Sequence, residues 1–224
     1  MKTKLFFILS YTLFAGCVKV IENSKPSAPV SGSVFSETYI TGYIIPESFT
    51  LPPYIFLSDG KSGQIVKPGT VIYIWFYGER CSADVNSALF NSIAKRIRDK
   101  NWNKYHFNGP VIALGKIITS VSVISDANFD ADHPVGTSLN DLVDFHGSTA
   151  YHFIQNGYKG NEREYINKKI SDLTENDLPF LINWDLSIEF TKLPDVQMNH
   201  KITVTITFED GVVLSATQDI VFSE

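Results

Sequence analysis

The sequence predicts a mainly β protein, an antiparallel β-sandwich of the immunoglobulin-like or a related type, with one α-helix near residues 83–98. Three observations support this prediction. Short segments of alternating apolar and polar residues recur, most clearly at 182–191 and 202–208. The pair Asp210-Gly211 follows one of these segments and is a preferred two-residue hairpin turn. Several short strands separated by turn signals are typical of sandwiches.

The first residues have the features of a secretory signal peptide. Two lysines precede an apolar run from Leu5 to Phe14, and small residues then lead to Cys17. The run is shorter than the ~20 apolar residues that a membrane-spanning helix needs. The stretch Leu13-Phe14-Ala15-Gly16-Cys17 resembles the lipobox of bacterial lipoproteins, although Phe14 stands where leucine is usual. This resemblance implies cleavage before Cys17 and lipidation of Cys17. The alternative is an ordinary secreted protein in which the cysteine is coincidental.

The sequence therefore divides into a signal peptide (1–16), a lipidated tether (17–33) and a single β-rich globular domain (34–224). The tether is rich in proline and serine and has no hydrophobic period. Cleavage removes Lys2 and Lys4, which takes the formal charge from −5 to −7. An acidic chain argues against nucleic acid as a partner. The expected partner is the membrane, through the lipid anchor, together with a glycan or an envelope protein.

Strand signals open the domain. Residues 39–45 alternate in period two, and Pro46 is expected to end regular structure there. The run 70–77 (TVIYIWFY) is apolar on both faces and predicts one central, buried strand. Cys81 follows this run, and we expect it to be buried because free cysteines are among the most buried residues.

The helix near 83–98 has a recognisable start and one apolar face. Ser82 is its predicted N-cap, and Asp84 would lie at the positive end of the helix dipole. Four residues spaced by four form the apolar stripe: Val85, Leu89, Ile93 and Ile97. This stripe is expected to pack on the sheet.

The rest of the chain predicts further strands. Residues 111–124 fit one or two strands, and 151–154 fit a short one. Residues 162–170 are ambiguous between helix and strand. The alternation at 182–191 predicts a half-buried strand with one wet face. Residues 202–208 should return through the Asp210-Gly211 turn as a hairpin.

A polar loop after the helix is the candidate ligand-binding site. Trp102, Tyr105 and His106 stand among asparagines. Flat aromatic rings beside amides suit a sugar, because the ring stacks on the sugar face and the amides bond its hydroxyls. The alternative is that Trp102 turns inward and closes the end of the sandwich.

A second loop has the alternating oxygen spacing of a calcium-binding loop. Its candidate metal ligands are Asp126, Asn128, Asp130 and Asp132. The EF-hand pattern needs glycine at its sixth position and glutamate at its twelfth, and these places hold Ala131 and Thr137. A standard EF-hand is therefore excluded. An irregular calcium loop and a polar turn that caps its own backbone both remain as interpretations.

Catalytic motifs are absent from the sequence. It contains no HExxH, GxSxG, P-loop or glycine-rich dinucleotide motif. We therefore expect no enzymatic activity and no cofactor. The rival hypothesis is a hydrolase that uses the acids and histidines between Asp126 and His152.

The run Phe129–Asp141 and the turn Glu209-Asp210-Gly211, together with the lipobox, resemble uncharacterised lipoproteins of gut and oral Bacteroidetes. That resemblance implies an outer-membrane, cell-envelope location and no particular activity. In such lipoproteins an acidic run after the cysteine accompanies surface export, and here only Glu22 is acidic. The periplasmic and surface faces therefore both remain open. The expected role is a structural or ligand-binding module of the envelope, with a carbohydrate-binding surface lipoprotein as the alternative.

Overall fold

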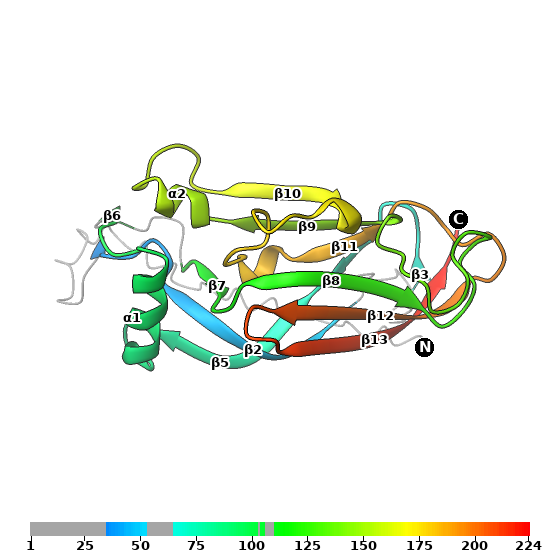
Figure 1. Cartoon of the computed structure of the whole chain (residues 1–224), viewed down its shortest axis with the longest axis horizontal. Coiled ribbons are helices and arrows are strands. Elements are labelled where there is room, and N and C mark those ends of the chain that lie inside the picture. Colours follow the sequence, from blue (N-terminus) through cyan, green and yellow to red (C-terminus); the bar gives the residue numbers. More distant parts are fainter. Residues whose placement is uncertain (1–34, 53–64, 103, 106–109) are drawn as a thin grey trace, which may run out of the picture. The chain divides into compact units, whose positions relative to one another are not determined.

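The computed structural model describes residues 35–52, 65–102, 104–105 and 110–224. Cys17, the signal peptide and the tether lie outside these residues. The described residues belong to one compact unit, Phe35–Glu224. This unit is mainly β, as the sequence predicts (Figure 1).

Two four-stranded sheets make up most of the unit. Sheet I has the order β10 (Glu164–Lys169), β9 (Val143–Thr149), β11 (Ser187–Phe190) and β4 (Val71–Tyr73), and all of its pairs are antiparallel. Sheet II has the order β3 (Ile65–Val66), β13 (Val213–Phe222), β12 (Asn199–Phe208) and β8 (Ile118–Ser125). In sheet II only the β3–β13 pair is parallel.

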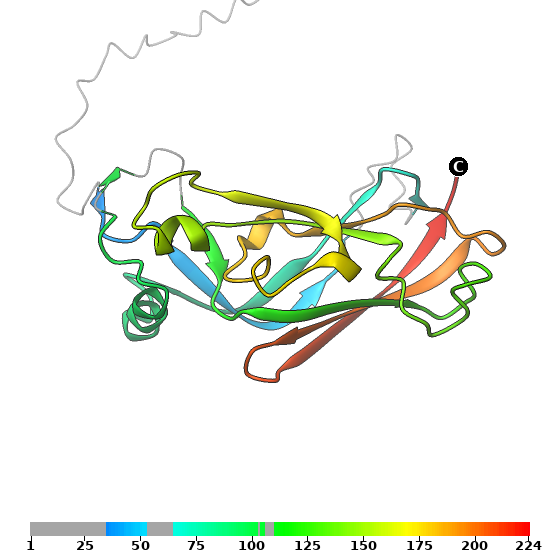
Figure 2. The ribbon, with the colours of Figure 1, turned by 45° about the horizontal axis from the view of Figure 1, so that its top comes forward.

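The remaining elements are smaller. Sheet III has the order β5 (Trp75–Ser82), β2 (Gly42–Thr50) and β7 (Ile112–Leu114), and β1 (Phe35–Ser36) pairs with β6 (Lys104–Tyr105). The helices are α1 (Ser87–Arg96) and α2 (Tyr151–Gln155), with short 3₁₀ turns η1 (Ile170–Asp172) and η2 (Asn183–Asp185). Both α-helices lie at one end of the unit, and the 126–142 loop lies at the other (Figures 1 and 2).

Two groups of buried side chains form the core. The larger group joins residues of sheets I and II, among them Phe145, Ile188, Val123 and Val204. The smaller group lies at the helical end and includes Tyr43, Ile93, Phe153 and Phe180. The second group packs α1 and α2 against sheet III, so it fixes the segments that follow each helix.

The run 70–77 is not one strand, so that prediction is wrong. It divides at Ile74, with β4 in sheet I and β5 in sheet III. Ile74 is fully buried, and its N–H donates to the Leu186 carbonyl at 2.9 Å. The run is apolar throughout because the chain passes from one sheet to another through the core.

Pro46 does not end regular structure, because it lies inside β2. The β2–β5 ladder shifts register between Pro46 and Ser48. On the other side of β2, β7 pairs only with Gly42 to Ile44. Proline has no N–H to donate, and a bulge beyond the last β7 partner is a position where strands tolerate this loss.

The helix begins later than the sequence predicts. Ser82 ends β5, and its hydroxyl accepts from the N–H groups of Asp84 and Val85. The N-cap is Asn86, whose side chain accepts from the Leu89 N–H. Serine and asparagine both favour caps and turns, so local sequence does not decide between them. Of the predicted stripe, Ile93 and Ile97 are buried and Leu89 is partly buried, while Val85 is exposed.

Two other segments differ from the predictions, and the structure assigns a third that was ambiguous in the sequence. Residues 151–155 form α2 and not a strand, so the unit has more than the one helix expected. The predicted strand at 182–191 is replaced at its start by η2, which leaves Trp184 40% exposed. The ambiguous segment 162–170 contains strand β10. At the start of 182–191, one turn of 3₁₀-helix takes the place of the strand that the period-two alternation predicts.

The hairpin and the burial of Cys81 are confirmed, but the predicted two-residue turn at Asp210-Gly211 is wrong. The loop is Glu209-Asp210-Gly211, because the Phe208 N–H donates to the Val212 carbonyl and the Gly211 N–H to the Phe208 carbonyl. Gly211, with φ of 79°, takes the left-handed position of this longer loop.

Strands β12 and β13 pair in register from Asn199 and Val221 to Thr207 and Val213. The apolar residues of β12 face the core, and Cys81 is 1% exposed.

We expect Val204→Asp to lower the free energy of unfolding by several kcal/mol, because it places an unpaired charge in the core, where Val204 is fully buried. Thr205→Asp should be mild, because Thr205 lies on the other face, where its hydroxyl bonds that of Ser215. Thermal unfolding of the two variants measures this difference. Equal melting temperatures would contradict the strand orientation.

Candidate functional site

A buried carboxylate, Asp99, organises the helical end of the unit. Its side chain is inaccessible to solvent. Oδ1 accepts from the Tyr39 N–H at 2.7 Å and Oδ2 from the Ile40 N–H at 2.8 Å. Oδ1 also accepts from the Tyr158 hydroxyl at 2.9 Å. Asp99 therefore joins the end of α1, the segment before β2 and the turn after α2.

The end of α1 turns through a motif that normally requires glycine. The Arg98 N–H donates to the Lys95 carbonyl and the Asp99 N–H to the Ala94 carbonyl, which is the hydrogen-bond pattern of a Schellman cap. Arg98 therefore has a left-handed backbone, with φ of 61°. A residue with a Cβ loses roughly 1–2 kcal/mol there relative to glycine. Arginine at this position therefore makes the protein less stable than glycine would. Residues held in such strained backbone conformations are common at functional sites.

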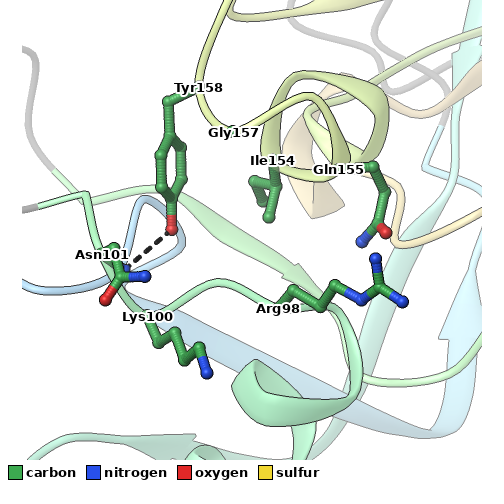
Figure 3. A pocket seen from close by; sticks show the side chains of 7 residues that line it. All are labelled: Arg98, Lys100, Asn101, Ile154, Gln155, Gly157 and Tyr158. Atoms are coloured by element: carbon green, nitrogen blue, oxygen red, sulfur yellow. Dashed lines mark hydrogen bonds between the residues drawn. The ribbon is translucent and has the colours of Figure 1, made fainter.

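A pocket of about 510 Å³ opens beside this turn (Figure 3). Its lining residues come from the turn after α1 and from α2 with its following turn: Arg98, Lys100, Asn101, Ile154, Gln155, Gly157 and Tyr158. The side chains of Arg98 and Gln155 lie at one side of the pocket, and Tyr158 and Asn101 lie at the other (Figure 3). Two cations line the pocket, and no carboxylate does.

Tyr158 connects the pocket to Asp99. Its hydroxyl donates to Asp99 and accepts from the Asn101 N–H at 3.2 Å. Burial raises the pKa of Tyr158 to about 12, so the phenol keeps the proton that it donates. Gln155 is fixed as well, because its side-chain amide donates to the Ile97 carbonyl at 2.6 Å. The walls of the pocket are thus held by hydrogen bonds within the protein.

Of the three predicted ligand-binding side chains, the structure describes the surroundings of Trp102. Trp102 is only 8% exposed and packs on the rings of Tyr39, Phe153 and Tyr158. A buried indole cannot stack on a sugar, so the interpretation that Trp102 turns inward describes its position. Tyr105 lies in β6, paired with Phe35 of β1. His106 lies outside the described residues.

Three of the four predicted calcium ligands accept hydrogen bonds from backbone N–H groups of the protein: Asp126, Asn128 and Asp130. Asp126 accepts from the Lys201 N–H, and Asn128 accepts from the Val135 N–H. The Asp132 N–H donates to Asp130, while Asp132 itself is exposed. The bonds to Asn128 and Asp130 are those of a polar turn that caps its own backbone, whereas Asp126 bonds the neighbouring strand β12. Within the described ranges, no three His, Cys, Asp or Glu side chains are grouped as a metal site requires.

Asp130 is a buried carboxylate at the centre of an ionic cluster whose outer members, Lys192 and Asp141, are exposed. Its carboxylate contacts His133 Nδ1 at 2.6 Å and Lys192 Nζ at 2.9 Å. His133 Nε2 lies 3.1 Å from Asp141. The bond from Lys192, followed by the bond from His133, lowers the pKa of Asp130 well below its usual range. The bond to Asp130 raises the pKa of His133, and the nearby Asp141 adds to this.

The same contacts make His133 unsuitable as a catalytic base. Both ring nitrogens face carboxylates, so the protonated ring, which donates from both, is the favoured form. His146 and His152 lie on β9 and α2, apart from this loop. The structure therefore does not bring the Asp126–His152 histidines together.

One serine–histidine contact in the core has no signal in the sequence. Ser125 Oγ lies 2.6 Å from His200 Nδ1, and His200 Nε2 lies 2.6 Å from the Gln197 carbonyl. Such a pair resembles a nucleophile and its base. Both residues are 3% exposed, however, and the rings of Phe129 and Phe222 pack against His200. The pair is a satisfied polar contact of the core. The alternation of β8 and β12 indicates that both residues point inward, but not that they meet.

Comparisons with family models, curated proteins and solved structures find no match for this chain. Neither helix of the described part of the chain has the length and apolar character needed to cross a membrane.

The His133 cluster predicts a specific pH dependence. The folded pKa of His133 is raised, so its contribution to stability is complete below the unfolded value of about 6.5 and is lost as the pH rises through the folded value. The folded pKa of Asp130 is lowered, so its contribution is lost only in strong acid. We expect His133→Gln to lower the melting temperature most at about pH 5.5, with the deficit shrinking towards about pH 9.

Melting curves of the wild type and His133→Gln across this pH range provide the measurement. A deficit that stays constant with pH would show that His133 acts only through packing or neutral hydrogen bonds.

Proposed function

We propose that this chain is a lipid-anchored cell-envelope protein whose folded unit binds a small anionic ligand in the pocket beside Asp99. The single observation that carries the proposal is the left-handed Arg98, which presents a guanidinium where glycine would be more stable. The lipobox at Cys17 and the resemblance to uncharacterised Bacteroidetes lipoproteins support the anchor and an outer-membrane location, on the periplasmic or the surface face.

The charges of the pocket support an anion as the ligand. Arg98 and Lys100 flank the buried Asp99 on the chain, and both are exposed. The Asn101 side chain adds a further donor to the lining. Hydrogen bonds between charged groups contribute about 1.5–3 kcal/mol each, and arginine binds carboxylate or phosphate through two parallel bonds. A cationic pocket in a chain of net charge −5 is therefore a local feature and not a consequence of overall composition.

Binding, and not catalysis, is the role that this pocket supports. Its lining residues include no serine, cysteine or histidine, so they provide neither a nucleophile nor a base of ordinary pKa near neutrality. The phenol of Tyr158 keeps its proton because its pKa is raised. A hydrolase would need such groups within reach of the ligand.

We also propose that sheets I and II face one another as an antiparallel β-sandwich. Buried residues of both sheets belong to one core, including Phe145 and Ile188 from sheet I and Val204 and Ile206 from sheet II. Such a sandwich would hold the pocket at one end as a rigid site. The parallel β3–β13 pair and the separate sheet III would be additions to that plan.

Binding of inorganic phosphate and of citrate to the full chain in detergent tests the pocket. We expect saturable binding that weakens with added salt. Arg98→Gly should weaken it about tenfold or more, while the melting temperature stays equal or rises, because glycine suits the left-handed position. Lys100→Gln should also weaken binding.

The matched control is Lys95→Gln, which removes an exposed cation of the last turn of α1 that does not line the pocket. Its affinity should equal that of the wild type. If neither anion binds, or if Arg98→Gly and Lys95→Gln bind equally well, the pocket is not an anion site.

We expect Cys17→Ala to release the protein from the membrane fraction, because acylation of Cys17 is its proposed anchor. Fractionation of cells, with a high-salt wash of the membranes, measures this. A variant that stays in the washed membrane pellet would refute the lipid anchor.

A further inference from the structure

The chain enters the folded unit beside the pocket. Phe35 of β1 pairs with Tyr105 of β6, and the Glu37 carbonyl accepts from the Trp102 N–H at 2.8 Å. The first residues of the unit therefore run antiparallel to residues 99–105, a segment that contributes two residues to the lining of the pocket. Strands β1 and β6 lie at the same end of the unit as both helices (Figure 1).

A lipid at Cys17 would therefore be joined to the unit at its pocket end. Phe35 follows Cys17 by 18 residues. A fully extended chain of that length spans about 60 Å, so the membrane that holds the lipid stays within that distance of Phe35. A short flexible link of this kind gives the second partner an effective concentration of the order of millimolar. Even a weak site for a membrane component would then be occupied.

The segments that build the pocket are basic in an acidic chain. Residues 95–104 and 151–160 contain six lysines and arginines and one carboxylate, the buried Asp99. Three of these cations are exposed and form no ion pair with another described residue: Arg98, Lys100 and Lys159. The exposed acids Glu37 and Glu162 lie in neighbouring segments and do not line the pocket.

The pocket is larger than a bare phosphate ion needs, and its lining is not polar throughout. Its volume of about 510 Å³ lies within the range of pockets that hold small organic molecules. Ile154 and the ring of Tyr158 offer carbon surface, while Arg98 and Gln155 offer donors (Figure 3). A matching ligand therefore joins an anionic group to an uncharged organic part.

Both walls of the pocket contain a strained residue. Tyr158, like Arg98, has a left-handed backbone, with φ of 62°. Such a conformation is unfavourable for a residue with a Cβ and persists only where the surroundings hold it. Here the Tyr158 hydroxyl bonds both Asp99 and the Asn101 N–H, which joins one wall to the other. The pocket is therefore formed before any ligand binds.

We propose that the pocket binds the phosphate headgroup of an acidic phospholipid in the membrane that carries the anchor. This inference rests on the proposed function, because it names the anion of the pocket at Arg98. The guanidinium would bond two phosphate oxygens, as arginine does with phosphate, and Lys100 would add its charge. The glycerol part of the headgroup would lie against Ile154 and Tyr158. Lys159, outside the lining, would face the anionic lipid surface.

Hydrogen exchange of the full, lipidated chain in vesicles tests this inference. One set of vesicles is phosphatidylcholine, and the other is phosphatidylcholine with about 30% phosphatidylglycerol. The backbone amides at 98–101 and 157–160 should exchange about fivefold more slowly in the acidic vesicles, because a ligand that binds only the closed site suppresses its opening. Arg98→Gly should remove this difference. The amides of the 126–142 loop, at the opposite end, should exchange equally in both vesicles.

Two lysine variants distinguish the membrane from a soluble anion. Lys159→Gln should reduce the protection in acidic vesicles about twofold or more but leave the affinity for inorganic phosphate in detergent unchanged, because Lys159 does not line the pocket. Lys201→Gln is the matched control. It removes an exposed cation beside the 126–142 loop and should change neither measurement.

Inorganic phosphate, added at millimolar concentration to the phosphatidylcholine vesicles, separates the two sources of the anion. It should slow the pocket amides less than phosphatidylglycerol does. Slowing by phosphate without slowing by phosphatidylglycerol would overturn the lipid assignment and leave the anion pocket standing. Equal exchange in the two kinds of vesicle, or protection that Arg98→Gly leaves intact, would also overturn it. Failure of phosphate and citrate to bind in detergent would instead remove the pocket itself.

Discussion

The pocket end of this protein depends on the hydrogen bonds accepted by the buried Asp99 carboxylate. Removing them would leave the N–H groups of Tyr39 and Ile40 unpaired, and an unsatisfied buried donor costs about 1–3 kcal/mol. Asp99 points inward, so its neighbours Arg98 and Lys100 are left at the surface. The same contact that closes the fold therefore places two cations at the mouth of a pocket.

The parts of the unit differ in whether their charged side chains are paired with opposite charges. At the end opposite the helices, the charges of Asp130, His133 and Lys192 are paired with one another, and these contacts tie the 126–142 loop to the segment after β11. At the helical end, Arg98 has no acidic neighbour in the lining of its pocket. On sheet I, Asp144 of β9 lies opposite Glu189 on one side and Lys169 on the other, so the like pair has an opposite charge beside it. The lining of the pocket at Arg98 carries two cations and no carboxylate, and this is the surface that we assign to an anionic ligand.

The sequence predicted those features of the fold that depend on local patterns of residues. The hairpin at Asp210-Gly211, the β character and the burial of Cys81 follow from alternation, turn chemistry and the usual burial of free cysteine. The break at Ile74 could not be predicted, because a strand that changes sheet and a central strand are equally apolar. The pocket could not be predicted either, because Arg98 and Tyr158 are 60 residues apart in the chain and meet only through tertiary packing. The predicted aromatic loop begins beside this pocket, which Asn101 lines, but Trp102 packs in the core.

Amide hydrogen exchange at Tyr39 and Ile40 tests the central claim most directly. Both N–H groups lie before β2, outside any strand, and both donate to the buried Asp99 carboxylate. The account predicts exchange as slow as that of the core strands in the wild type, and much faster exchange in Asp99→Ala under conditions where the rest of the protein stays folded. Rapid exchange at both amides in the wild type would show that Asp99 does not hold this end of the protein together.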